Sequence, residues 1–134
     1  MPILGFDFGS KRIGVAIVPD DMNFALPLLT IDGTVEEQWR KIDELIKKQS
    51  PRSIVVGLPY TMSGAEGEQA DAARAFSNQL FERYNIPVNL VDERLSSVEA
   101  ARAGAVDIDA SSAAIILDTF ITKNVKPGDD LFDL

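Results

Sequence analysis

Three acidic residues stand out in this 134-residue chain because of the segments that carry them. Asp7 lies within the apolar run Ile3–Phe8, Glu93 follows a later apolar run, and Asp109 opens the last helical segment. A carboxylate inside an apolar strand costs free energy unless a charged or hydrogen-bonding group meets it. Carboxylate oxygens suit Mg²⁺ or Mn²⁺. Two such ions about 3.5–4 Å apart can activate water for phosphodiester hydrolysis, so these acids are candidate metal ligands.

Each acid also has an ordinary structural interpretation. Asp7 could accept hydrogen bonds from turn amides, although the strand continues beyond it. Asp109 is a good helix N-cap, and a capping role is at least as well supported by the sequence as a ligand role. Asp92 competes with Glu93, because neighbouring residues of a strand point to opposite faces. Asp118 lies on the opposite face of the helix from Asp109, so we expect it to be exposed to solvent.

The composition restricts the chemistry further. The chain contains no cysteine and no histidine, which excludes thiol catalysis, zinc–thiolate sites and the commonest general base. The net charge of −8, from 21 acidic and 13 basic residues, argues against a basic nucleic-acid coat protein. Metal ions would offset the acids gathered around a site. With no apolar stretch of membrane-spanning length and no secretory signal, we expect a cytoplasmic protein.

The elements that must position the acids follow from apolar patterning and turn signals. Five strands are predicted, at 3–8, 13–18, 25–31, 53–57 and 88–91. Four helices are predicted. The first is opened by a capping box formed by Thr34 and Glu37 and ends before Pro51, and the others lie at 69–84, 96–102 and 110–122. The first helix carries Val35, Trp39, Ile42 and Ile46 at helical spacing, so we expect these residues to form its apolar face, with the basic residues largely elsewhere.

This order of elements predicts one α/β domain over residues 1–134. Antiparallel hairpin strands come first and parallel strands follow, which gives a five-stranded mixed sheet flanked by helices. Pro27 removes a ladder donor and places the third strand at an edge. We expect residues 127–134 to be a mobile acidic tail. Ligands bind beyond the carboxyl ends of parallel strands, so the three acids converge if the first strand is central.

Three basic residues are candidates for contact with nucleic-acid phosphates: Lys11, Arg12 and Arg94. Lys11 and Arg12 lie in the turn 9–12, which is not a Walker A loop because the Gly-Lys-Ser/Thr order is absent. A solvated hairpin turn is the simpler interpretation of both. Arg94 can pair with phosphate or with a neighbouring acid, and the sequence favours neither.

Four segments resemble the signature blocks of the YqgF/RuvX family, in the family's order and spacing. These are Phe6-Asp-Phe-Gly-Ser-Lys-Arg-Ile-Gly-Val-Ala16, Val56-Gly-Leu-Pro59, Val91-Asp-Glu-Arg-Leu-Ser-Ser97 and Asp109-Ala-Ser-Ser-Ala-Ala-Ile-Ile-Leu117. Members of this family are bacterial proteins named as pre-16S rRNA nucleases and formerly as Holliday junction resolvases. The resemblance implies the ribonuclease H-like fold, with Asp7, Glu93 and Asp109 as catalytic and metal-binding acids.

The function that the resemblance implies is a two-metal nuclease, a hydrolase of ester bonds that processes the 5′ end of pre-16S rRNA. A ribosomal precursor particle would be its partner, and we expect a monomer or weak homodimer. The alternatives are a Holliday junction resolvase, which would need an obligate dimer, and a non-catalytic RNA-binding ribosome assembly factor. A nucleotide-binding module of the actin/sugar-kinase type would need a second domain, for which the chain has no room.

One segment departs from the family pattern. The stretch 100–108 is shorter than in similar proteins, and Arg102 is its only basic residue. Together with the acidic net charge, this predicts weak, salt-sensitive binding to nucleic acid, because few bases are available to replace phosphate counterions.

Overall fold

The computed structural model describes residues 1–9, 11–58, 67–92 and 108–124. The described elements follow the predicted order: β1 (Ile3–Phe8), β2 (Ile13–Val18), β3 (Leu26–Ile31), α1 (Val35–Gln49), β4 (Ser53–Leu58), α2 (Glu68–Tyr84), β5 (Val88–Asp92) and α4 (Ile108–Asn124). The helix predicted at 96–102 and the tail predicted at 127–134 lie outside the described residues. No helix in the described ranges is long and apolar enough to cross a membrane.

The strands form one mixed sheet in the order β3-β2-β1-β4-β5. β2 pairs antiparallel with both β1 and β3, whereas β4 pairs in parallel with both β1 and β5. The predicted five-stranded sheet, with hairpin strands first and parallel strands later, is therefore confirmed. β1 lies at the centre of the sheet, and β3 lies at an edge, as Pro27 predicted.

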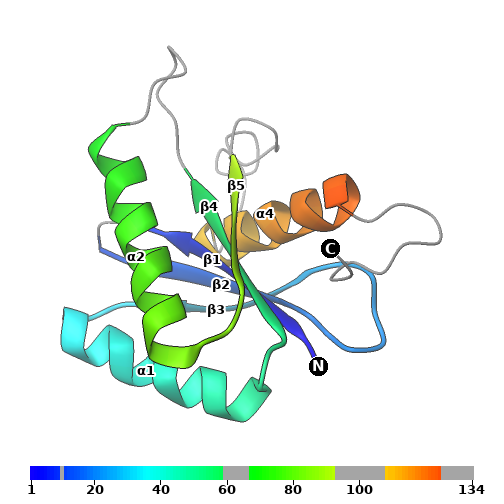
Figure 1. The fold of residues 1–134 in the computed structure, drawn as a ribbon, viewed down its shortest axis with the longest axis horizontal. Helices are drawn as coiled ribbons and strands as arrows, with labels where there is room; N and C mark the ends of the chain where they lie inside the picture. Colours follow the sequence, from blue (N-terminus) through cyan, green and yellow to red (C-terminus); the bar gives the residue numbers. More distant parts are fainter. Residues whose placement is uncertain (10, 59–66, 93–107, 125–134) are drawn as a thin grey trace.

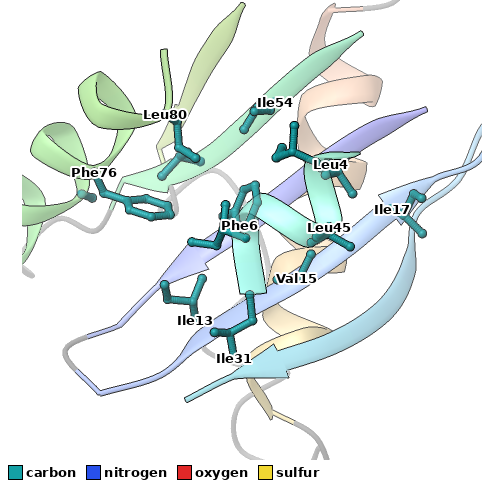
Figure 2. Packing of buried hydrophobic residues seen from close by; sticks show 14 of the residues in the cluster. Leu4, Phe6, Ile13, Val15, Ile17, Ile31, Leu45, Ile54, Phe76 and Leu80 are labelled. Carbon is teal, nitrogen blue, oxygen red and sulfur yellow. The ribbon is translucent and has the colours of Figure 1, made fainter. Parts of the chain in front are cut away.

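Helices cover both faces of this sheet, with α1 and α2 on one side and α4 on the other (Figure 1). The side chains of β1 alternate between the two resulting cores. Leu4 and Phe6 pack with α1 and α2 in the larger core (Figure 2), and Ile3 packs with α4 in the smaller one. Asp7 lies four residues after Ile3, and alternate residues of a strand share a face. Asp7 is therefore on the face that α4 covers.

Local signals fix the ends of α1. The hydroxyl of Thr34 accepts a hydrogen bond from the Glu37 amide at 3.1 Å, as the predicted capping box requires. The helix ends at Ser50, which adopts a left-handed conformation with φ of 46°. One expectation for this helix was wrong: Val35 is 68% exposed, because it is the first helical residue and lies before the stripe that packs on the sheet.

α4 packs directly on β1 where that strand carries glycine. A Cβ atom placed on Gly5 would lie 3.1 Å from Leu117 Cβ and 3.4 Å from the Ala113 carbonyl oxygen. Side-chain atoms rarely approach so closely in a packed interior, so glycine is what lets the helix approach the strand. Gly5 therefore sets the distance between α4 and the centre of the sheet.

We expect Gly5→Val to lower the free energy of unfolding by about 1–3 kcal/mol, because the new side chain meets Leu117 and the backbone of α4. Leu117→Ala alone should also destabilise the protein, through the cavity it leaves. The double variant should lose less stability than the sum of the two, since the cavity accepts the valine. Urea unfolding of the four proteins measures this coupling, and strict additivity would show that the two positions do not compete for space.

Candidate active site

The buried carboxylate of Asp7 is the centre of the candidate site. Asp7 lies near the carboxyl end of the central strand, and only 7% of its surface is exposed. The neighbouring strands carry no side chain at its level. Gly14 of β2 pairs with Asp7. On the other side, Val56 of β4 pairs with Phe6, so the next residue, Gly57, lies beside Asp7. The carboxylate is therefore flanked by glycine on both sides, and no neighbouring strand side chain crowds it.

Two contacts give the direction of α4 across the sheet. Leu117 lies against Gly5, and Asp118 accepts a hydrogen bond from the amide of Ala25, which directly precedes β3. The registers of β3 on β2 and of β2 on β1 place that end of β3 beside the first residues of β1. The first turn of α4 therefore lies toward the end of β1 that carries Asp7 (Figure 1).

Asp109 occupies this first turn. Its backbone lies one helical turn, about 6 Å, before Ala113, whose carbonyl faces Gly5. The helix begins at Ile108 rather than at the predicted residue 110, so Asp109 is a first-turn residue and not the N-cap. Acidic residues are favoured at the N-cap by capping and in the first turn by the helix dipole, so the sequence alone does not separate the two positions. The side chain of Asp109 lies outside the described part of the structure.

β5 brings the chain to the same end of the sheet. The registers pair Phe6 with Val56 and Gly57 with Val91, so Asp7 and Val91 are level across three strands. Parallel strands end at one edge of a sheet, and β5 ends there at the residue after Val91.

Glu93 and Arg94 directly follow β5 in the sequence, and both lie outside the described residues. The structure therefore describes the strand that leads to them and not their side chains. Among the predicted acids, it brings Asp7 and the backbone of Asp109 to one end of the sheet, and the position of Glu93 stays a prediction.

The turn between β1 and β2 adjoins this end of the sheet. Its backbone is closed by a hydrogen bond from the Gly9 amide to the Arg12 carbonyl oxygen at 2.9 Å. A Cβ atom on Gly9 would lie only 2.7 Å from that oxygen, so the turn requires glycine there. Gln38 of α1 adds a hydrogen bond to the Lys11 carbonyl oxygen at 3.1 Å. The side chains of Lys11 and Arg12 are both exposed, which leaves them accessible to a phosphate backbone.

Comparisons with known proteins cover most of the chain. A sequence profile of the RuvX family, described as Holliday junction resolvase, matches residues 1–123. The chain belongs to the RuvX family. A relative from Enterobacter sp. (strain 638), named "Putative pre-16S rRNA nuclease", is 42% identical over 135 residues, covering 90% of this chain and 96% of its own. A relative of the same name from Legionella pneumophila is 37% identical over 132 residues, covering 90% and 95%.

A solved structure with the same fold is T. thermophilus RuvC in complex with a Holliday junction substrate. It aligns with a TM-score of 0.60 and 16% identity, over 92% of this chain and 94% of that one. At this identity the likeness establishes the fold alone, which is ribonuclease H-like, as the resemblance of the four sequence blocks implied.

The donor chemistry of this RuvX-family site suits a hard divalent cation. The chain offers no histidine or cysteine, and Asp7 supplies a buried carboxylate. Ser112 of α4 is fully buried, and its hydroxyl has no hydrogen-bond partner among the described residues. Carboxylate oxygens such as those of Asp7 suit Mg²⁺ or Mn²⁺. Within the described residues no three acidic side chains gather to hold an ion, so a three-acid site stays a prediction.

The sequence did not predict the environment of two polar residues of α4. Asp118 was expected to face solvent, and this was wrong: its carboxylate is partly buried and accepts the Ala25 amide at 2.7 Å. Facing away from Asp109 did not mean facing water, because the β2–β3 connection covers that side of the helix. Ser112 was not singled out at all. In both cases the available signal was a polar residue in a helix that is rich in apolar residues.

Replacing Asp118 with alanine should lower the free energy of unfolding by about 1–3 kcal/mol, because the Ala25 amide loses a charged acceptor. Asp118→Asn should cost less, since an amide oxygen can still accept. Thr119→Ala is the matched control, because the Thr119 hydroxyl donates to the Ile115 carbonyl oxygen of its own helix, at 2.8 Å. Urea unfolding measures all three, and equal losses in Asp118→Ala and Thr119→Ala would contradict a role in fastening α4 to β3.

Proposed function

We propose that this protein is a metal-dependent nuclease that hydrolyses phosphodiester bonds at the end of the sheet marked by Asp7. The observation that carries the proposal is the buried Asp7 carboxylate on the central strand, flanked by Gly14 and Gly57 on the face of the sheet that α4 covers. Taking a carboxylate out of water costs free energy, and a bound cation would offset part of that cost. Family membership supports the same reading.

Three acids would hold the ion or ions: Asp7, Glu93 and Asp109. Bound Mg²⁺ or Mn²⁺ would supply Lewis-acid chemistry, activating a water and stabilising the leaving oxygen. In the two-metal mechanism, two ions would share these roles. The contribution of the chain is to fix these carboxylates on a strand, a strand end and a helix. Lys11, Arg12 and Arg94 would bind phosphates on either side of the cleaved bond, which orients the substrate.

The substrate we propose is the 5′ end of pre-16S rRNA, within a ribosomal precursor particle. Relatives that match this chain over about nine-tenths of its length carry the pre-16S rRNA nuclease name. Holliday junction cleavage is the second candidate, favoured by the description of the family profile. A junction resolvase must cut two strands symmetrically, so it needs two copies acting together. A monomer or weak homodimer fits the RNA substrate better.

We expect Asp7→Asn, Glu93→Gln and Asp109→Asn each to lower metal-dependent cleavage by at least about 100-fold while the fold is retained. Each change keeps the shape of the side chain and removes the charge that binds the cation. Cleavage of a precursor rRNA fragment and of a four-way DNA junction, each with manganese or chelator, tests activity and substrate together. Asp32→Asn, which alters an acid whose side chain is 72% exposed, is the control. Full activity in any of the three variants would remove that residue from the site.

Metal should also stabilise the folded protein through Asp7. An ion that binds only the folded form adds about 2.7 kcal/mol at a hundredfold excess over Kd, which moves the melting midpoint of a domain of this size by several degrees. Asp7→Asn removes one like charge from the cluster, so its midpoint in chelator should hold or rise while its response to manganese shrinks. Thermal melts of both proteins in chelator and in millimolar manganese measure this. An equal manganese shift in both would show that Asp7 is not a ligand.

A further inference from the structure

A groove lies between α1 and α2, on the face of the sheet opposite to Asp7. Its volume is about 280 Å³, and it is bounded by both helices and by the strand ends that flank the β1–β2 turn. Phe8 and Ile13 form its floor, and Trp39 of α1 and Phe76 of α2 are among its walls. None of these residues has a part in the site proposed for catalysis.

The aromatic side chains of the groove are held in a fixed arrangement. Phe8 stacks on Phe76 with ring centroids 4.5 Å apart and 23° between the planes. Trp39 lies 5.4 Å from Phe76 at 41°, and the Arg83 guanidinium lies 4.0 Å from the centre of the Trp39 ring. Phe8 and Trp39 are only partly buried, so the groove presents aromatic surface to solvent. Rigid aromatic surface of this kind is what unpaired bases stack on.

Polar and charged groups of the groove match a nucleotide. The amides of Gln38 and Gln79 line it from opposite helices. The Gln38 nitrogen donates to the Lys11 carbonyl oxygen, which leaves its amide oxygen as an acceptor. The exposed cations Lys11 and Arg12 lie in the turn that joins the two floor strands. Base edges can therefore meet amides in the groove while backbone phosphates meet positive charge at its rim.

The groove and the proposed active site lie on opposite faces of β1, and the β1–β2 turn adjoins both. Phe8 directly follows Asp7, and their side chains point to opposite faces of β1. Ile13, on the groove floor, directly follows Arg12. A nucleic-acid strand that passes the β1–β2 turn would reach the groove on one side of β1 and Asp7 on the other.

We propose that this groove binds one unpaired base of the nucleic-acid substrate and so positions the neighbouring backbone for cleavage. The proposal rests on the nuclease function proposed above. Drug-sized ligands occupy pockets of roughly 300–1,000 Å³, so a groove of about 280 Å³ suits one base and not a folded peptide segment. The ligand class is a single-stranded or extruded nucleobase, read by stacking and by its hydrogen-bonding edge.

The test uses the fluorescence of Trp39, which is the single tryptophan of the chain. The full-length Asp7→Asn protein is titrated in chelator with a short single-stranded RNA and with the same strand carrying abasic sites. The intact strand should change the Trp39 emission and bind more tightly by roughly 5- to 150-fold, the range expected for one stacked base. Equal affinity for intact and abasic strands would overturn the proposal.

A pair of variants locates the binding. Ala75→Leu fills the groove from an exposed position on α2, whereas Asn78→Leu adds a leucine to the same helix outside the residues that line the groove. Ala75→Leu should weaken binding of the intact strand to the level of the abasic strand, and Asn78→Leu should leave it unchanged. Both changes place a good helix former at an exposed position, so thermal melts should show folded proteins. Equal binding by the two variants would overturn the proposal.

Cleavage assays separate this inference from the proposed function. If the protein with Asp7 intact cleaves precursor RNA and Ala75→Leu leaves KM unchanged, the groove proposal fails and the nuclease function stands. If the intact strand binds in the groove but no substrate is cut, the groove proposal stands and the nuclease function fails.

Discussion

The contact between α4 and Gly5 of β1 is the constraint on which the rest of the site depends. A side chain at this position would meet Leu117 at about van der Waals contact or closer, so glycine fixes how near the helix lies to the central strand. The distance between α4 and the sheet determines where the first turn of the helix, and with it the backbone of Asp109, lies relative to Asp7. The bond from the Ala25 amide to Asp118, the residue after Leu117, then ties the helix to the chain just before β3. One close approach and one hydrogen bond thus hold α4 in a single orientation.

Side chains alternate along β1, so the two faces of this strand have different roles. On one face Ile3 and Gly5 pack against α4, and Asp7 completes the row. On the other face Leu4, Phe6 and Phe8 pack against α1 and α2. A register shift of one residue would place the carboxylate among aromatic rings. β1 must therefore pair with both neighbouring strands in the correct register. Buried apolar residues in β2 and β4 supply that specificity.

Much of the fold follows from local patterns in the sequence. The strands are short apolar runs bounded by turns, and their predicted ends differ from the structure by a residue at most. Thr34 and Glu37 marked the start of α1 correctly because a capping box is a local interaction. The role of Asp118 could not be predicted in this way. Its partner lies 93 residues away in the sequence, and helical periodicity reports only which face a residue is on, not what covers that face.

The position of α4 also has a consequence for how the chain acquires its structure. This helix is the last described element in the sequence, yet it packs on the first strands, β1 to β3. During synthesis the apolar face of the hairpin sheet therefore stays uncovered until residues 108–124 have emerged. Contacts of such long sequence separation form late, and the open sheet face is vulnerable to aggregation in the meantime. The face that carries Asp7 is thus completed only when almost the whole chain has been made.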